Sequence, residues 1–298
     1  MHRHRKNQLH YNLMLMPGAL MVFLFNTITW LGILLAFQDF IPSRGWFGSP
    51  WVGLDNFRIF FDMPDSFEII KNTVVIAVGK IVITTIFAIV FALLLHEIPG
   101  GRLKKTIQTA VYLPHFISWV IFATVIRSML NIDGVVNKLL MMLGLKEPIL
   151  FLGTMSIFPI VMILTEAMKE FGFSAIIYLA AITNIDPGLY EASAIDGAGR
   201  MRKLLHVTLP GILPIIILMA TLSLGNVLNA GFDQIFNMYS PSVYSTGDII
   251  DTYVYRLGIV NFNYGIGSAV GLFKSVISLM LMSLAYFLAA KFGDYKIF

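Results

Sequence analysis

The feature that most limits the fold of this chain is a series of long apolar runs. We place six of them at residues 13–37, 72–95, 106–130, 151–168, 209–230 and 269–290. A helix rises 1.5 Å per residue, so about twenty residues cross a hydrocarbon core about 30 Å thick. Hydrophobic residues make up 57% of the chain and charged residues only 13%, a balance that water-soluble domains rarely show. The sequence therefore predicts an all-α integral membrane protein with about six transmembrane helices.

Charge predicts how these spans are oriented. With the N-terminus in the cytoplasm, about twice as many Lys and Arg residues fall in cytoplasmic segments as in outer ones, which favours both termini inside. The first run is too long for a removed signal peptide and lacks a small-residue cleavage site, so we expect it to remain as an anchor. The net charge of +4 is explained by basic residues that flank the spans and meet membrane lipid, so it does not indicate nucleic acid.

The connections between spans carry weaker signals. Residues 38–71 are rich in aromatic side chains, typical of an interfacial belt, with docking of an external partner as the alternative. Residues 131–150 predict a short amphipathic helix that ends at Gly144. Residues 231–268 are too polar to span, and we expect outer loops with a partly re-entrant piece. Gly267 and Gly271 have a spacing that lets another helix approach closely.

One polar passage, residues 186–210, interrupts the apolar pattern after the fourth run. Asp186 is placed to cap a helix that starts at Pro187 and ends near Ile195. Glycines should break this helix, and a second helix should resume at Arg200. The small, sparsely charged face suits insertion into a groove of a cytosolic partner. Pattern alone leaves a second interpretation equally open, an amphipathic hairpin on the membrane surface.

The spacing of this passage resembles a known family motif. Glu191-Ala192-Ser193, three residues, Gly197, nine residues, Val207, one residue and Leu209-Pro210 resemble the EAA loop of binding-protein-dependent ABC importer permeases. Ser193 stands where a second Ala is usual, and Val207 replaces Ile. The segments 15–25 and 48–57 resemble the sugar-importer branch that handles complex oligosaccharides and polysaccharide fragments, similar to alginate importer permeases.

The resemblance implies a single permease domain over residues 1–298 with the type I ABC importer fold, in the bacterial cytoplasmic (inner) membrane. It implies that the passage is a coupling helix that docks into an ATPase, with Gly197 supplying a backbone turn that a side chain would obstruct. The implied coupling residues are Glu191, Ala192, Ser193, Asp196, Gly197 and Arg200. The implied partners are a second homologous permease, a cytoplasmic ABC ATPase dimer that binds ATP and Mg, and an extracytoplasmic solute-binding protein.

No catalytic or metal-binding motif stands out in the chain itself. The Gly- and Lys-containing stretch 267–275 does not follow a strand and lacks the P-loop spacing. His96-Glu97 has no second histidine four residues later, so no zinc-protease motif is present. We therefore expect no enzyme activity, no cofactor and no metal in this chain, with ATP hydrolysis in the partner.

Three cations, Lys80, Arg127 and Lys274, fall inside the proposed spans, in what we place as their outer halves. Intramembrane charge is costly and needs a reason. They either reach the interface and pair locally, or form a basic lining for an acidic oligosaccharide such as an alginate or galacturonan fragment. We also expect Glu166, Lys169 and Glu170 to pair with one another or with the coupling loop. The predicted function is import of oligosaccharides or polysaccharide fragments; the alternative is an ion-coupled secondary transporter or channel.

Overall fold

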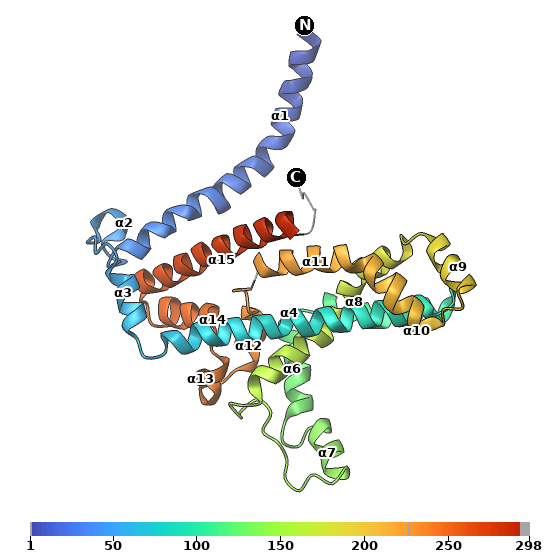
Figure 1. The fold of residues 1–298 in the computed structure, drawn as a ribbon. Coiled ribbons are helices and arrows are strands. Elements are labelled where there is room, and N and C mark those ends of the chain that lie inside the picture. Colours follow the sequence, from blue (N-terminus) through green and yellow to red (C-terminus); the bar gives the residue numbers. More distant parts are fainter. Residues whose placement is uncertain (1, 226, 293–298) are drawn as a thin grey trace. The chain divides into compact units, whose positions relative to one another are not determined.

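The chain folds into helices joined by short turns (Figure 1). The computed structural model describes residues 2–225 and 227–292, and the side chains of residues 11–225 and 227–287. Within the described residues there is no strand, only one isolated bridge between Gln38 and Trp51. The predicted all-α class is therefore confirmed. The chain divides into two compact units, one of Met1–Ser66 with Val254–Phe273, the other of Phe67–Tyr253 with Lys274–Phe298.

The first unit contains the N-terminal helix and the segments around the start of the last helix. A run of helical turns continues α1 to Phe37 before the chain leaves the helix at Gln38. The bounds in this unit are α1 (His2–Val22), turns at Phe23–Thr27 and Ile28–Phe37, α2 (Gly45–Gly48), α3 (Asp55–Asp62), turns at Tyr255–Val260, and the beginning of α15 (Tyr264–Phe292).

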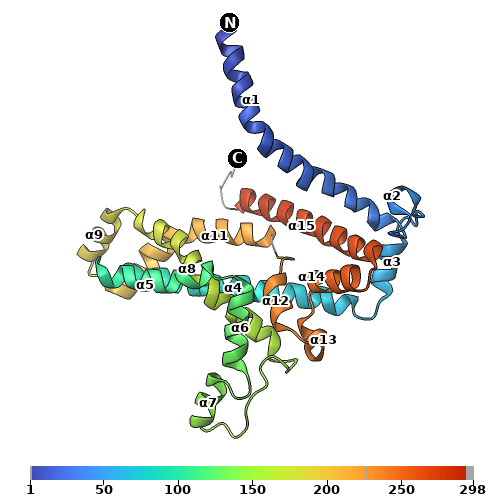
Figure 2. The same cartoon turned by 180° about the vertical axis from the view of Figure 1, so that it is seen from behind.

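The second unit holds the remaining helices. Their bounds are α4 (Ser66–Glu97), α5 (Arg102–Tyr112), α6 (Trp119–Leu130), α7 (Val135–Met142), α8 (Phe158–Thr183), α9 (Pro187–Ile195), α10 (Arg200–Lys203), α11 (Leu209–Gly225), α12 (Phe232–Met238), α13 (Tyr244–Gly247) and α14 (Ile250–Val254). Both ribbon views show α4 running beside α8 and α11 (Figures 1 and 2). The predicted amphipathic helix before Gly144 is confirmed as α7.

Small residues let these helices pack closely. Ala88 and Ala92 of α4 are fully buried against Ala175 and Tyr178 of α8 and Ile212 of α11. The opposite face of α4 carries exposed apolar side chains at every fourth residue, as a helix facing lipid or another subunit requires. These exposed residues are Val78, Val82, Ile86, Val90 and Leu94.

Five helical segments within the described residues are long and apolar enough to cross a membrane. They are Tyr11–Phe37, Ser66–Glu97, Trp119–Met142, Arg200–Gly225 and Tyr264–Phe287. The helix α8, the fourth proposed span, is 26 residues long but carries three charged side chains and is not among the five.

Two of the six expected spans differ most in their bounds, and the helix of the fifth, expected at 209–230, ends at Gly225. The run at 106–130 is divided into α5 and α6 by a break that includes Pro114, and Ser118 caps α6 by accepting a hydrogen bond from Ile121 N. The run at 151–168 is shifted: turns occupy its first residues, and α8 extends from Phe158 to Thr183. The expected end at residue 168 coincided with charged residues that are paired inside the protein.

Candidate functional site: an exposed helical hairpin and a charged cavity

The helix α9 begins and ends where its sequence predicts. At the N-terminus, Gly188 N donates to Asp186 Oδ1 over 2.9 Å, and Pro187 occupies the first turn, where no intrahelical donor is needed. At the C-terminus, Ala198 N donates to Ser193 O and Gly197 N donates to Ala194 O, the pair of bonds that closes a helix through a left-handed residue. Both ends are therefore fixed by local hydrogen bonds.

Gly197 supplies that left-handed residue, with φ +73°. A Cβ at this position would meet no atom of the chain within 4 Å. The expected obstruction by a side chain is thus not found within this chain: the need for glycine comes from the backbone conformation. The space next to Gly197 is open for another molecule.

The hairpin, which we define as residues 186–208, is closed at its base by contacts between its own two arms. Tyr190 Oη and Thr208 Oγ1 are 3.0 Å apart and join α9 to the turn that leads into α11. Ser193 is half-buried because its hydroxyl donates to Tyr190 O over 2.8 Å. These contacts turn two short helices into a stiff element.

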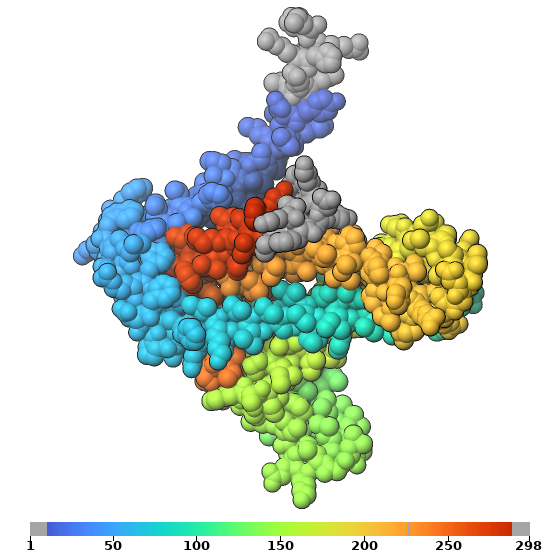
Figure 3. All heavy atoms as spheres, viewed as in Figure 1, coloured from blue at the N-terminus to red at the C-terminus, as the bar shows by residue number. Residues whose placement is uncertain are grey.

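The tip of the hairpin combines apolar and charged side chains on one exposed surface. Ile195 is 87% exposed and Met201 is 67% exposed, so apolar surface is available at the tip for contact with another molecule. In the space-filling view the yellow and gold atoms of the hairpin form a lobe at one end of their unit (Figure 3). Of the predicted coupling residues, Glu191, Ala192, Asp196, Gly197 and Arg200 are exposed, and Ser193 alone is half-buried.

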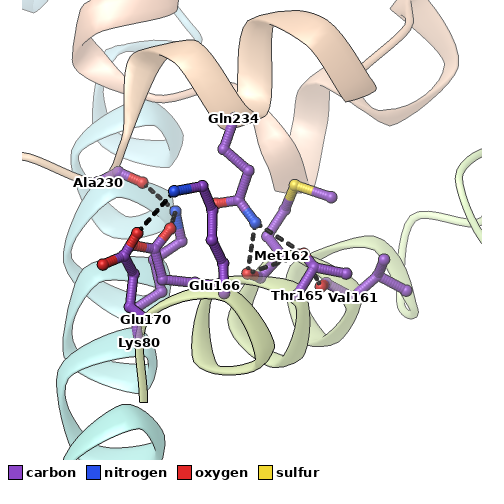
Figure 4. A network of polar contacts seen from close by, with 9 residues as sticks. Lys80, Val161, Met162, Thr165, Glu166, Glu170, Ala230 and Gln234 are labelled. Atoms are coloured by element: carbon purple, nitrogen blue, oxygen red, sulfur yellow. Dashed lines mark hydrogen bonds and ion pairs between the residues drawn. The ribbon is translucent and has the colours of Figure 1, made fainter. Parts of the chain in front are cut away.

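The second feature is a charged cavity among α4, α8 and the residues that precede α12. Lys80 lies near the middle of α4 and is only 6% exposed. Its Nζ is 3.3 Å from Glu166 Oε2 and donates to Ala230 O over 2.5 Å (Figure 4). A buried ammonium is tolerated when its charge is paired and its protons are shared in this way.

Glu170, one helical turn after Glu166, takes part in a second set of contacts. Its Oε1 is 2.9 Å from Lys169 Nζ, and its Oε2 is 2.6 Å from His115 Nδ1. Lys169 also donates to His115 O over 2.8 Å and lies over the ring of Trp119. The expected pairing among the three charges of this helix is confirmed for Lys169 and Glu170, whereas Glu166 pairs with Lys80.

Gln234 connects α12 to α8 beside this network. Its Nε2 donates to Met162 O over 2.8 Å and to Thr165 Oγ1 over 2.7 Å, and the side chain is fully buried (Figure 4). The amide therefore holds α12 at a set position over the first third of α8.

The cavity itself has a volume of about 440 Å³. It is lined by apolar, hydroxyl, amide and charged groups: Ala77, Lys80, Ile81, Thr84, Thr85, Glu166, Glu170, Ser174, Tyr178, Met219, Leu222, Ser223, Asn229, Ala230 and Gly231. This volume and mixture are typical of a small-molecule site. The charges that line it are one cation and two carboxylates.

The three predicted path cations do not come together. Lys80 lines the cavity, but Arg127 donates to Asn237 O over 3.2 Å on α12, and Lys274 is 2.5 Å from Asp251 Oδ1. Lys80 and Lys274 each pair with a carboxylate, as the alternative of local pairing expects, whereas Arg127 bonds a backbone carbonyl. The sequence analysis missed Glu166 and Glu170 as cavity residues; their spacing of four residues on one face of an apolar helix was the available signal.

Together, the apolar helices, the charged cavity between them and the exposed hairpin define a membrane component of a transport system. The family model described as "Binding-protein-dependent transport system inner membrane component" matches residues 84–294. The chain belongs to this family and is a multi-pass membrane protein.

Individual proteins similar to this chain indicate the kind of transport system more closely. The chain is 40% identical over 292 residues to the polygalacturonan/rhamnogalacturonan transport system permease protein YteP of Bacillus subtilis, covering 98% of this chain and 91% of the relative. It is 39% identical over 287 residues to the protein LplB of the same organism, covering 96% and 90%. A crystal structure of a bacterial alginate ABC transporter, in complex with an alginate pentasaccharide-bound periplasmic protein, contains a chain with a TM-score of 0.87 and 34% identity, covering 98% of both chains. The type I importer permease fold is thereby confirmed.

Proposed function

We propose that this chain is a transmembrane subunit of an ABC importer for oligosaccharides released from polysaccharides, and that its hairpin couples transport to a partner ATPase. The partner would bind ATP and Mg, and this chain would hold neither. A second permease and an extracytoplasmic binding protein would complete the assembly. The named functions of the relatives and the periplasmic protein in the alginate transporter structure support this reading.

The observation that carries the coupling role is the stiffness of the exposed hairpin. The two ends of α9 are closed by local hydrogen bonds, and Tyr190 bonds to Thr208, the residue directly before α11, so the two arms of the hairpin are joined where the chain enters α11. A push on a stiff element is transmitted to the helix behind it, whereas a flexible loop would absorb it. Membrane-surface binding, the other interpretation of this passage, would not need such a tight connection.

The topology follows from counting crossings. If α8 spans together with the five apolar segments, the N-terminus, the hairpin and the C-terminus all fall on one side of the membrane. Coupling to a cytoplasmic ATPase requires this side to be the cytoplasm, in agreement with the distribution of basic residues.

The names of the relatives support acidic oligosaccharides as substrates. Lys80, Arg127 and Lys274 add less support for an acidic substrate than their sequence positions suggested. Glu166 neutralises Lys80, and Arg127 and Lys274 do not line the charged cavity. Within the cavity, hydroxyl, amide and carboxylate groups suit the hydroxyls of a sugar, and we place the path of the substrate there.

One observation favours a second candidate function. Glu166 and Glu170 are carboxylates inside a membrane helix and line a cavity, as in ion-coupled transporters. An ion-coupled carrier would transport without ATP, so dependence of uptake on ATP hydrolysis separates the two candidates.

The test is ATPase activity that co-purifies with this chain from a host expressing its membrane partners. Gly197→Asp should abolish or uncouple the activity. Gly144→Asp is a matched control, because Gly144 also has a positive φ, +105°, with no atom within 4 Å of a Cβ, and lies after α7. Loss in both variants would point to general damage, and absence of ATPase from the intact wild-type preparation would exclude the proposed function.

A further inference from the structure

A second cavity lies wholly within the first unit, between the segment after α1 and the start of α15. Its volume is about 350 Å³, within the range of about 300–1,000 Å³ for small-molecule sites. Its lining includes Gln38, Asp39, Asp55, Ile59, Phe262 and Tyr264. By the same count of crossings, the chain segments that line it fall on the side of the membrane opposite to the hairpin. The proposed function assigns no role to this cavity.

The floor of this cavity is held by a network of backbone bonds. Asp39 N donates to Pro50 O over 3.0 Å, and Val52 N donates to Phe37 O over 2.9 Å. The buried amide of Asn56 donates to Gln38 O over 2.9 Å and to Ala36 O over 3.0 Å. The cavity is therefore formed by a stiff framework and not by the packing of loose loops.

Hydrogen-bond acceptors gather on one part of the lining. Gln38 is only 2% exposed; its Nε2 donates to Trp46 O, and its Oε1, which has no hydrogen-bond partner among the described residues, is itself buried behind the cavity surface. Asp39 and Asp55 add two carboxylates, and the contact of Asp55 with Arg58 is long, 3.8 Å, and solvent-exposed, so it neutralises little. The two carboxylates on this side of the cavity suit a ligand that brings hydrogen-bond donors.

Aromatic rings form another part of the lining. Phe262 has φ +58°, which residues other than glycine rarely adopt, and its side chain is 69% exposed. Its ring centroid is 6.3 Å from that of Tyr264, which in turn contacts Phe40 edge-on at 5.8 Å. A strained backbone that presents an apolar ring at the edge of a polar cavity is a feature found at binding sites.

We propose that this cavity binds one uncharged sugar ring of the transported oligosaccharide as it enters. The C–H face of the sugar would lie on Phe262 and Tyr264, and its hydroxyls would donate to the carboxylate oxygens of Asp39 and Asp55. A uronate ring is disfavoured, because its carboxylate would meet two others. A metal ion fits less well, since no group of three or more acidic or histidine side chains is gathered within the described part of the chain. The proposal rests on the proposed function for the source of its ligand.

The test uses the assembled transporter in lipid nanodiscs and a reporter inside the cavity. The chain has no cysteine, so Ile59→Cys, at a lining position that is 44% exposed, can carry a single environment-sensitive fluorophore. The probes are galactotetraose, which is neutral, and tetragalacturonate, which carries a carboxylate on every ring. We expect saturable quenching by the neutral probe and weaker binding of the charged probe. A reporter at Ile195→Cys, in the hairpin, is the control for effects elsewhere.

Two variants assign the site. Phe262→Asn keeps a residue that tolerates a positive φ and removes the ring, so we expect about a three- to tenfold higher Kd for galactotetraose. Asp39→Asn keeps the shape and removes one charge, which should reduce the preference for the neutral probe. Equal binding of both probes to the wild type, or Kd values unchanged by both variants, would overturn the proposal.

The remaining outcomes separate this inference from the proposed function. If sugar-free binding protein changes the Ile59 reporter and free sugars do not, the cavity is a protein contact and the proposal is wrong. If ATPase activity co-purifies normally but the cavity reporter does not respond to either sugar, only the inference fails. If the cavity binds galactotetraose but no ATPase associates, the proposed function fails and the sugar site remains.

Discussion

The Nζ of Lys80 lies 3.3 Å from Oε2 of Glu166, joining the middle of α4 to the N-terminal half of α8. Removing one member of a buried ion pair leaves the other charge without compensation, which is more costly than never having had the pair. We expect Glu166→Gln to lower the free energy of unfolding toward the lower end of about 3–5 kcal/mol, because the Glu166 side chain is 23% exposed to the cavity. Reversible unfolding in mixed micelles, followed by tryptophan fluorescence, measures the loss.

The double variant Lys80→Met/Glu166→Gln serves as the control for this pair. It removes both charges and leaves neither uncompensated, so it should be more stable than Glu166→Gln alone. Strictly additive effects of the two substitutions would show that the pair is not coupled.

The glycine pair at the start of α15 gives a second prediction. A Cβ on Gly267 would lie 2.8 Å from Gly258 Cα, whereas a Cβ on Gly271 would meet nothing within 4 Å. Gly267→Ala should therefore destabilise by about 1–3 kcal/mol through overpacking. Gly271→Ala, in the same helix, should be neutral or stabilising by about 0.5–1 kcal/mol. Thermal unfolding of the two variants in the same detergent measures the difference in stability. An equal loss of stability in both would contradict the close approach of Gly267 to Gly258.

The hairpin provides a third prediction, which separates backbone strain at Gly197 from contact with the partner ATPase. Alanine at Gly197 has to adopt φ +73°, at a cost of about 1–2 kcal/mol, while Gly199 has φ −71° and open space around it. Gly197→Ala should reduce coupled ATPase activity, and Gly199→Ala should leave it close to wild type. Activity is measured on co-purified complexes normalised to this chain. A larger effect at Gly199 would mean that contact with the partner, and not backbone conformation, dominates at this turn.

Topology can be tested because the chain has no cysteine of its own. Single cysteines at Ile195, in the hairpin, and at Phe47, whose side chain is fully exposed after the first span, should react from opposite sides of the membrane. A membrane-impermeant maleimide added to intact cells should label Phe47→Cys, and Ile195→Cys should react only after permeabilisation. Labelling of both from outside would rule out the proposed number of crossings.

Arg127 is expected to matter little for the choice of substrate. Its guanidinium donates to Asn237 O and does not line the central cavity. Arg127→Gln should therefore change the uptake of neutral and acidic oligosaccharides by the same factor, within about twofold. Loss of a contact worth about 1.4 kcal/mol to the acidic substrate alone would instead separate the two by about tenfold. Parallel uptake assays with the two kinds of probe make the comparison. Selective loss of acidic uptake would return Arg127 to the substrate path.

Much of the hairpin could be read from the sequence because its determinants are local. Asp186, Pro187 and Gly197 each act on backbone groups within a few residues, so the bounds of α9 were predicted correctly. The apolar runs were equally informative about helical class, since length and hydropathy need no knowledge of neighbours. The family resemblance was carried by the same hairpin and is confirmed by the family match.

Charges inside the spans were harder to interpret. The charged residues Lys169 and Glu170 follow Met168 and indicated the end of a span, but α8 continues to Thr183. Within the protein, Glu166 pairs with Lys80 of α4, and Glu170 pairs with both Lys169 and His115. The cost of a charge in a helix depends on whether another helix supplies its partner. That partner is distant in the chain, so only the folded structure shows it.

The sequence by itself thus determined that the chain is helical, where its spans lie approximately, and the shape of the hairpin. The tertiary structure decided that Lys80 lies beside two carboxylates in a cavity, and that Arg127 and Lys274 do not share it. It also brought Gln38 and Phe262 to one cavity from opposite ends of the chain. The physical reason is that capping and hydropathy act within a few residues, whereas cavities and ion pairs depend on how helices pack.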